Sequence, residues 1–289
     1  YILWRKYPET SPFYDGFYKM QKEMLKKRNI PTEIWVTETG WTTYLPDSIR
    51  RHFPPVTEYQ QAQYLVRNYL VQLYFGAGKM FWYELVEEPF GVHHPESGFG
   101  ILRYNTMLTV KPAAVAFANM VNNYRYLKPI GKYLAKDRKT YGFIYENEKE
   151  SGAPVLSIWR EADEKEELIP VKYTKSLTGV DIFGRTIEIP IIDGMAHLPL
   201  SMSVLTVSGF DMDDLKNLFE RKEQYWKADG TVEHFVYILS DYLVCPKQLL
   251  RCGRGRWNSG GNYVCYRSIE RREKSGGFRT FGTYWRASR

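Results

Sequence analysis

Apolar residues recur at the spacing of an amphipathic helix in three segments of the first half of the chain. The first segment follows Ser11-Pro12, which is typical of an N-cap with proline at the first helical position, and the second follows a capping box of Thr57 and Gln60. Pro112 opens the third. The apolar positions that define the three predicted helices are Phe13, Phe17, Met20 and Met24; Ala62, Leu65, Val66, Tyr69, Leu70 and Leu73; and Ala113, Ala116, Phe117, Met120, Val121 and Tyr124.

Two short apolar runs between these helices predict strands that end in carboxylates. Ile34 to Glu38 lies in "PTEIWVTETGW" and is expected to be a buried strand, and Lys79 to Val86 reads "KMFWYELV". The resulting order is helix, strand, helix, strand, helix, which predicts an α/β fold with a parallel sheet covered by helices. Active sites of such folds lie at the carboxyl ends of the strands, which is where Glu38 falls.

The pattern changes near Gly131, where short β-like runs replace the helical period. These runs are "TYGFIYE" from residue 140, "APVLSIW" from 153, "TIEIPII" from 186 and "SVLTVSG" from 203, and turn signals such as Asp193-Gly194 separate them. We therefore predict a small antiparallel β-sandwich domain that ends near Phe210. The charged segment from Asp211 to Lys227 is a candidate helix.

Charge separates the last part of the chain from the rest. The net charge of the 289 residues is +7, but residues 245–289 alone carry 11 Lys and Arg against 2 Asp and Glu. All three cysteines, Cys245, Cys252 and Cys265, lie in this basic segment, and their spacing lacks the short pairs of zinc sites. No apolar run approaches the roughly 20 residues of a membrane span, and no segment resembles a signal peptide.

The two predicted strand ends bring carboxylates and indoles together. Because side chains alternate along a strand, Trp82 and Glu84 should share one side of the second strand, and Glu38 should face them with Trp41 in the following loop. Sugars suit such a site, since their apolar ring faces stack on aromatic rings while a carboxylate attacks or stabilises the anomeric carbon. Taken alone, each of these residues is also compatible with an ordinary core or strand-end position.

These residues carry a resemblance to a known group of enzymes. "WVTETGW" followed about forty residues later by "FWYEL" resembles the last two strands of the retaining (β/α)8 glycoside hydrolases of clan A, and is similar to families thirty-nine and five of that clan. "GFGILRYNTMLTVKPAAVAFANMV" is similar to the segment that leads into the last barrel helix, and "DIFGR" with "LPLSMSVLTVSG" to the β-sandwich domain that often follows.

The resemblance implies a division of the chain and a role for each site residue. Residues 1–130 would form the C-terminal part of a TIM (β/α)8 barrel, 131–210 a small β-sandwich domain and 211–289 a charged, then basic tail. Glu38 would be the nucleophile that forms a glycosyl-enzyme ester in O-glycosyl hydrolysis, and Trp41, Trp82 and Glu84 would bind substrate. An oligo- or polysaccharide substrate is implied, with no cofactor and no metal. A secreted or periplasmic location would suit the family.

One part of the family pattern is missing. The acid/base of these enzymes is a Glu preceded by Asn, and no Asn-Glu-Pro occurs upstream of Glu38. The chain is therefore expected to be an N-terminally truncated fragment without hydrolytic activity of its own. The alternatives are a non-catalytic carbohydrate-binding remnant or nucleic-acid binding through the basic tail, whose Arg residues alternate with Tyr and Trp. His93-His94 could bind a metal ion or sugar hydroxyls, but histidines in loops are usually solvated, and this second interpretation is favoured.

Overall fold

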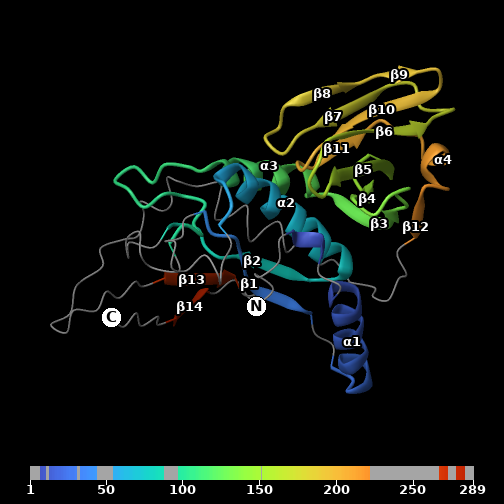
Figure 1. Ribbon diagram of the computed structural model, residues 1–289. Helices are drawn as coiled ribbons and strands as arrows, with labels where there is room; N and C mark the ends of the chain where they lie inside the picture. Colours follow the sequence, from blue (N-terminus) through green and yellow to red (C-terminus); the bar gives the residue numbers. More distant parts are fainter. Residues whose placement is uncertain are drawn as a thin grey trace. The chain divides into compact units, whose positions relative to one another are not determined.

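The computed structural model describes residues 7–10, 13–30, 33–43, 55–87, 97–150, 152–221, 267–272 and 278–283. The chain divides into two units, residues 1–239 and 240–289. In the described part of the first unit, helices and strands alternate at the start and an antiparallel β region follows (Figure 1). The elements of the alternating part are η1 (Pro8–Thr10), α1 (Phe13–Lys27), β1 (Trp35–Thr39), α2 (Glu58–Phe75), β2 (Lys79–Trp82) and α3 (Pro112–Tyr124). The predicted order of three helices and two strands is confirmed, and β1 pairs with β2 in parallel.

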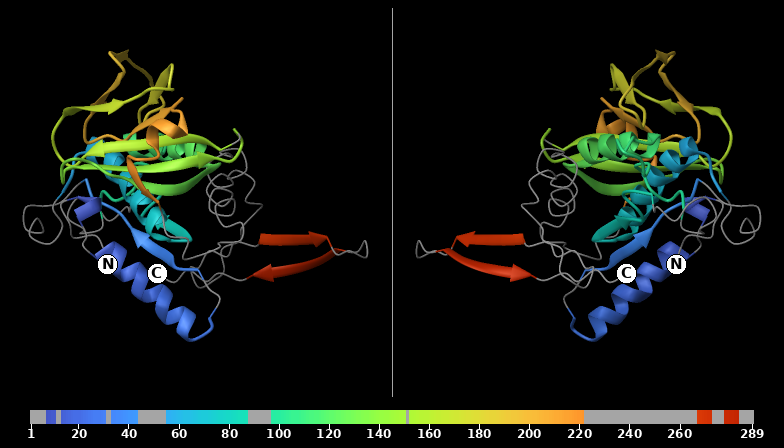
Figure 2. Two further views of the ribbon diagram at one scale, coloured as in Figure 1. Left: turned by 90° about the vertical axis from the view of Figure 1, so that its right-hand side faces the viewer. Right: turned by 90° about the vertical axis from the view of Figure 1, so that its left-hand side faces the viewer.

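Helix α2 lies at the centre of the first unit, because most of its residues are buried. The predicted capping box holds its start: the Thr57 side chain accepts from the Gln60 N–H, and the Gln60 side chain accepts from the Thr57 N–H. Gly76 ends the helix with a φ of 110°, a left-handed conformation that glycine adopts at little cost. The helix packs on α3 through the ring of Tyr69 and on the β region through the ring of Tyr74, so that α2 lies between the β1–β2 pair and that region (Figure 2).

The apolar face predicted for α1 does not lie in a core. Phe17, Met20 and Met24 are 41%, 54% and 40% exposed, whereas Tyr18 is buried and its hydroxyl donates to the Oε1 atom of Gln72 in α2. The spacing therefore identified a helix but not the side by which it packs. In the described part of the chain, α1 contacts α2 through Tyr18 and its neighbours, and the apolar stripe faces away from this contact.

Strand β1 is also more open than its sequence predicted. Trp35 is 50% exposed and Phe81 on β2 is 38% exposed, and the two rings contact each other at 6.1 Å between centroids. The prediction of a buried strand was wrong because it assumed a parallel sheet covered on both faces. In the described residues this sheet has two strands, and one of its faces is not covered.

Two sheets that share one hydrophobic core form the second half of the unit. A seven-stranded sheet has the order β12-β3-β4-β5-β11-β7-β8, and a three-stranded sheet has the order β6-β10-β9. In the described residues, the strand pairs of these two sheets are antiparallel. The strands are β3 (Leu127–Tyr133), β4 (Thr140–Asn147), β5 (Ala153–Arg160), β6 (Lys165–Pro170), β7 (Leu177–Val180), β8 (Thr186–Ile189), β9 (Ile191–Ile192), β10 (Met195–Leu200), β11 (Leu205–Ser208) and β12 (Phe219–Arg221).

The four β-like runs of the sequence correspond to β4, β5, β8 with β9, and β11, and the predicted turn at Asp193-Gly194 has positive φ at both residues. The fully buried side chains of Ile144, Leu156 and Ile158 from the larger sheet meet Ile169 and Leu198 from the smaller one. The core is thus shared by both sheets, as a two-layer β arrangement requires. The description of this region as a β-sandwich domain of residues 131–210 stays a prediction.

The sheet continues past Phe210, where a charged helix was a candidate. The helix found there, α4 (Met212–Leu215), has four residues, and β12 then pairs with β3. Asp214 accepts hydrogen bonds from the backbone N–H groups of Lys172, Tyr173 and Thr174 and so fastens α4 to the loop after β6. The candidate helix from Asp211 to Lys227 is thus replaced by a short helix and an edge strand as far as Arg221.

In the second unit, the described residues form one antiparallel hairpin of β13 (Arg267–Arg272) and β14 (Phe278–Thr283). The three cysteines and His93-His94 lie outside the described residues, as does most of the basic segment. Among the described helices, none is both long enough and apolar enough to cross a membrane.

Candidate active site at the carboxyl ends of β1 and β2

Glu38 is the penultimate residue of β1 and its side chain is exposed to solvent. Its neighbour Thr39 is buried and pairs with Trp82 of β2, so the backbone of Glu38 lies next to the end of β2. The ladder has an irregular register between Val36 and Thr39. Strict alternation of side chains therefore cannot be carried from Val36 to Glu38, because a bulge changes the direction in which the following residues point.

A chain of buried polar side chains holds the end of β1 against α2. The hydroxyl of Tyr18 donates to Gln72, the amide of Gln72 donates to Asn68 at 2.8 Å, and the amide of Asn68 donates to the hydroxyl of Thr39 at 3.1 Å. Burial raises the pKa of Tyr18 well above its ordinary value, so the hydroxyl stays protonated and can donate. These contacts fix the backbone immediately after Glu38. The sequence did not predict them, because Asn68 and Gln72 lie on α2 outside its predicted apolar face and yet are buried.

The two predicted indoles meet at this edge. The rings of Trp41 and Trp82 are stacked, with 6.1 Å between centroids and 26° between planes. Tyr64 of α2 packs edge-on against Trp41, which is 5% exposed, and Tyr7 packs on Tyr64. The indole N–H of Trp82 donates to the carbonyl of Phe99 at 3.2 Å. Trp82 is thus the more accessible of the two rings, and Trp41 lies behind it.

Glu84 does not lie on β2. The strand ends at Trp82, the peptide bond between Tyr83 and Glu84 is cis, and Val86 forms an isolated bridge with Leu102. The predicted strand from Lys79 to Val86 is therefore too long by four residues. Glu84 is half-buried, and its carbonyl accepts from the N–H of Ile101. The structure brings Trp41 and Trp82 together beside the backbone of Glu38, while Glu84 follows in the next loop.

Two further buried side chains, neither foreseen from the sequence, hold the loops around this edge. Gln61 of α2 donates to the carbonyls of Trp41, Gly98 and Phe99 at 2.8, 3.1 and 3.2 Å. The ammonium of Lys111, at the start of α3, donates to Thr43, Glu87 and Gly98. Burial lowers the pKa of Lys111, an effect that the carboxylate of Glu87 opposes.

A buried ion pair lies behind the aromatic rings. The guanidinium of Arg67, on α2, contacts the carboxylate of Glu9, and the side chains are 0% and 2% exposed. The guanidinium also lies over the rings of Tyr7 and Tyr64, at 5.6 and 5.2 Å from their centroids. The indole of Trp159, on β5, donates to Glu9 at 2.8 Å. The pair therefore joins the alternating part of the first unit to the β region.

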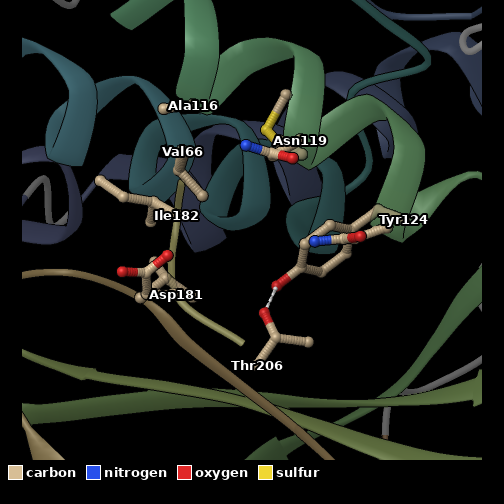
Figure 3. Close-up of a pocket in the computed structure, with 10 residues that line it drawn as sticks. Val66, Ala116, Asn119, Tyr124, Asp181, Ile182 and Thr206 are labelled. Atoms are coloured by element: carbon tan, nitrogen blue, oxygen red, sulfur yellow. Dashed lines mark hydrogen bonds between the residues drawn. The ribbon is translucent and has the colours of Figure 1, made fainter. Parts of the chain in front are cut away.

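A small hollow between α2, α3 and the β region is separate from this edge (Figure 3). Figure 3 shows the hydroxyl of Tyr124 directed at Thr206, which it contacts at 2.7 Å, with Asp181 and Asn119 on the other walls. The space is sufficient for about one water molecule, which is far too small for a sugar ring. None of the four predicted site residues lines it.

The described residues contain no group of three His, Cys, Asp or Glu side chains that could hold a metal ion. The strand ends offer the solvent-exposed carboxylate of Glu38 and, beside its backbone, the stacked indole pair. A platform of this kind can bind the apolar face of a sugar ring, and a carboxylate can act as a nucleophile or stabilise positive charge.

The fold of the chain is similar to part of a solved glycoside hydrolase. A family 39 glycoside hydrolase from the gut symbiont Bacteroides cellulosilyticus WH2 superimposes with a TM-score of 0.56 at 20% sequence identity. The match covers 68% of this chain and 37% of that one, so the chain spans little more than a third of the enzyme's length. No protein-family model matches the sequence, and no curated protein matches it. At this identity the similarity describes the fold.

Proposed function

We propose that this chain carries the nucleophile and part of the sugar-binding surface of a retaining glycoside hydrolase that acts on O-glycosyl bonds of an oligo- or polysaccharide. The observation that carries the proposal is the stacked Trp41–Trp82 pair at the carboxyl ends of two adjacent parallel strands, with Trp41 three residues after Glu38. The fold similarity to a family 39 glycoside hydrolase supports it. In this proposal Glu38 attacks the anomeric carbon, the leaving group departs with the bonding electron pair, and water later releases the glycosyl ester.

The indoles have different tasks in this proposal. Trp82 offers its ring to the sugar, because it is the more accessible of the two. Trp41, which is 5% exposed, supports Trp82 from behind and contributes to binding through that contact. Glu84 follows the platform in the next loop and is proposed to hydrogen-bond a sugar hydroxyl.

The proposal includes a limit on activity. Retaining hydrolysis needs a second carboxyl group about 5–5.5 Å from the nucleophile to protonate the leaving group, and the Asn-Glu-Pro sequence that supplies it in the family is absent upstream of Glu38. General acid assistance is typically worth about 10²–10⁴-fold. We therefore expect no detectable hydrolysis of natural glycosides by this chain alone, and reaction only with leaving groups that need no proton.

The test is covalent trapping. A set of 2-deoxy-2-fluoro β-glycosides with a dinitrophenolate leaving group is incubated with the protein, and the adduct is located by mass spectrometry. We expect the glycosyl mass on Glu38, no adduct in Glu38→Gln, a reduced yield in Glu84→Gln and an unchanged yield in Glu188→Gln, a replacement of an exposed carboxylate on β8. An adduct on another carboxylate would refute the role of Glu38.

A second function, carbohydrate binding without catalysis, is favoured by the stacked indole pair, which can bind a sugar ring without a reacting carboxylate. If this function is right, oligosaccharides should quench the Trp fluorescence of the wild type but not that of Trp82→Ala. No covalent adduct should form in the trapping experiment. If neither an adduct nor quenching is found with any glycoside, both functions are excluded.

A further inference from the structure

Two consecutive backbone carbonyls, those of Gly98 and Phe99, accept hydrogen bonds from four described parts of the chain near the indole pair: the loop after β1, α2, β2 and the start of α3. The carbonyl of Gly98 accepts from the N–H and hydroxyl of Thr43, from Gln61 and from Lys111, at 3.0 to 3.1 Å. The carbonyl of Phe99 accepts from Gln61 and from the indole of Trp82. Gly98 has a φ of 86°, a conformation that suits glycine and aims its carbonyl at these donors.

Gln61 links these carbonyls directly to the first indole. Its side chain is fully buried, and the two N–H bonds of its Nε2 atom are shared among the carbonyls of Trp41, Gly98 and Phe99. The orientation of the amide follows from these partners, because turning it over would place its oxygen against three carbonyl oxygens. One side chain on α2 therefore sets the backbone of Trp41 and, through Phe99, the acceptor that holds the ring of Trp82.

Lys111, directly before α3, also holds the loops around the indole pair through its hydrogen bonds. Its side chain is fully buried, and its three N–H bonds are directed to Thr43 in the loop after β1, to Glu87 in the loop after β2 and to Gly98. An ammonium group has three donors, so this set satisfies it completely. Burying a charge is costly unless every donor is paired, and here the pairing is made with three separate loop segments rather than with the core.

We propose that Gln61 and Lys111 are positioning residues that set the geometry of the Trp41–Trp82 platform. The value of this geometry for sugar binding rests on the proposed function, but the positioning itself does not. Replacing either residue with Met keeps the approximate volume and removes the donors. The loops then lose the contacts that fix both indoles, and the stack opens while α2 keeps its capping box and its C-cap at Gly76.

Circular dichroism measures the stacking of the two indoles directly. Two stacked indoles give an exciton couplet in far-ultraviolet circular dichroism, and the difference between wild type and Trp82→Phe defines its contribution. We expect Gln61→Met and Lys111→Met to lose most of the couplet at a temperature well below their thermal midpoints. Leu65→Ala is the matched control, because it empties space at a fully buried position of the same helix outside the network. It should lower the thermal midpoint and leave the couplet intact.

A gentler variant covers the case in which the Met variants do not fold. Thr43 is half-buried in a loop, and Thr43→Val removes both an acceptor of Lys111 and a donor to Gly98. It should reduce the couplet without loss of folding. A full couplet in this variant and in every folded Met variant would overturn the inference. If the couplet is lost as expected but wild type binds no glycoside, the positioning role stands and the proposed function fails. If wild type binds glycosides while the couplet survives in the variants, the proposed function stands and the positioning role fails.

Discussion

Replacing Arg67 with Met should destabilise the protein more than any exposed substitution, because Arg67 neutralises a carboxylate that cannot reach water. Arg67 and Glu9 are 0% and 2% exposed, and the guanidinium also lies near the carbonyls of Met202 and Glu161, at 3.4 and 3.3 Å. Met fills a similar volume and leaves Glu9 with the indole N–H of Trp159 as its remaining charge-stabilising partner among the described residues.

The expected loss in the free energy of unfolding depends on the buried charge that the substitution leaves unpaired. Removing one partner of a buried ion pair typically costs about 3–5 kcal/mol, because the other charge stays buried without compensation. Replacing both partners removes that penalty, and such replacements are often neutral or stabilising. We therefore expect Arg67→Met to lose about 3–5 kcal/mol of the free energy of unfolding. The double variant Arg67→Met/Glu9→Gln should lose clearly less, since the amide oxygen that Glu9→Gln introduces can still accept from Trp159 and the amide carries no charge.

Urea unfolding monitored by Trp fluorescence gives these values, and the two single variants with the double variant form a thermodynamic cycle. Arg138→Met is the control, because Arg138 is exposed on the turn before β4 and should change stability by less than about 0.5 kcal/mol. A loss of under about 1 kcal/mol for Arg67→Met, or a double variant no more stable than Arg67→Met, would contradict the argument that an uncompensated charge dominates the cost.

Two further predictions concern α2 and α3. Thr57→Ala removes the side-chain acceptor of the α2 N-cap and should cost about 1 kcal/mol in urea unfolding, whereas Thr57→Ser, which keeps the hydroxyl, should cost much less; equal losses would contradict a capping role. Burial raises the pKa of Tyr124 to about 12, against about 10 in an unfolded chain. Between these values the unfolded chain gives up the proton and the folded protein keeps it, so stability falls as the pH rises. Tyr124→Phe should remove this part of the alkaline loss of stability, and an unchanged slope of unfolding free energy against pH above 10 would refute it.

Local signals in the sequence were sufficient for the elements whose ends are defined by their own residues. Helix α2 starts at a capping box and ends at Gly76, and both features are readable without knowledge of the fold. The strands of the β region were found where turn residues bound them, as at Asp193-Gly194. Strand β6, with the sequence KEELIP, was missed because one of its two buried residues is the charged Glu167, while the apolar Leu168 is exposed. The hydrophobic pattern therefore does not follow the buried face, and a short alternation is a weak signal in any case.

The candidate site was predictable only in part, because the contacts that shape it join distant segments. Thr43 and Gly98 are 55 residues apart, and Gln61 reaches Phe99 across 38. Neither residue carries a local sign of its partners: Gln61 lies in the first turn of α2, and Lys111 comes directly before Pro112, at the N-cap of α3. The bulge near Val36 has no such sign either, and it invalidates the alternation rule at the residue where the prediction relied on it.

The exposure of Glu38 constrains how it could act. A carboxylate in water is stabilised by hydration, and that hydration must be displaced before the oxygen can attack a carbon atom. A sugar stacked on Trp82 would cover part of this edge and displace some of the water around Glu38. Binding of the sugar would then also activate the carboxylate. A rigid platform would favour this activation, because a loose indole would admit water between ring and carboxylate. The network of Gln61 and Lys111 is for this reason the part of the site on which any chemistry at Glu38 would depend.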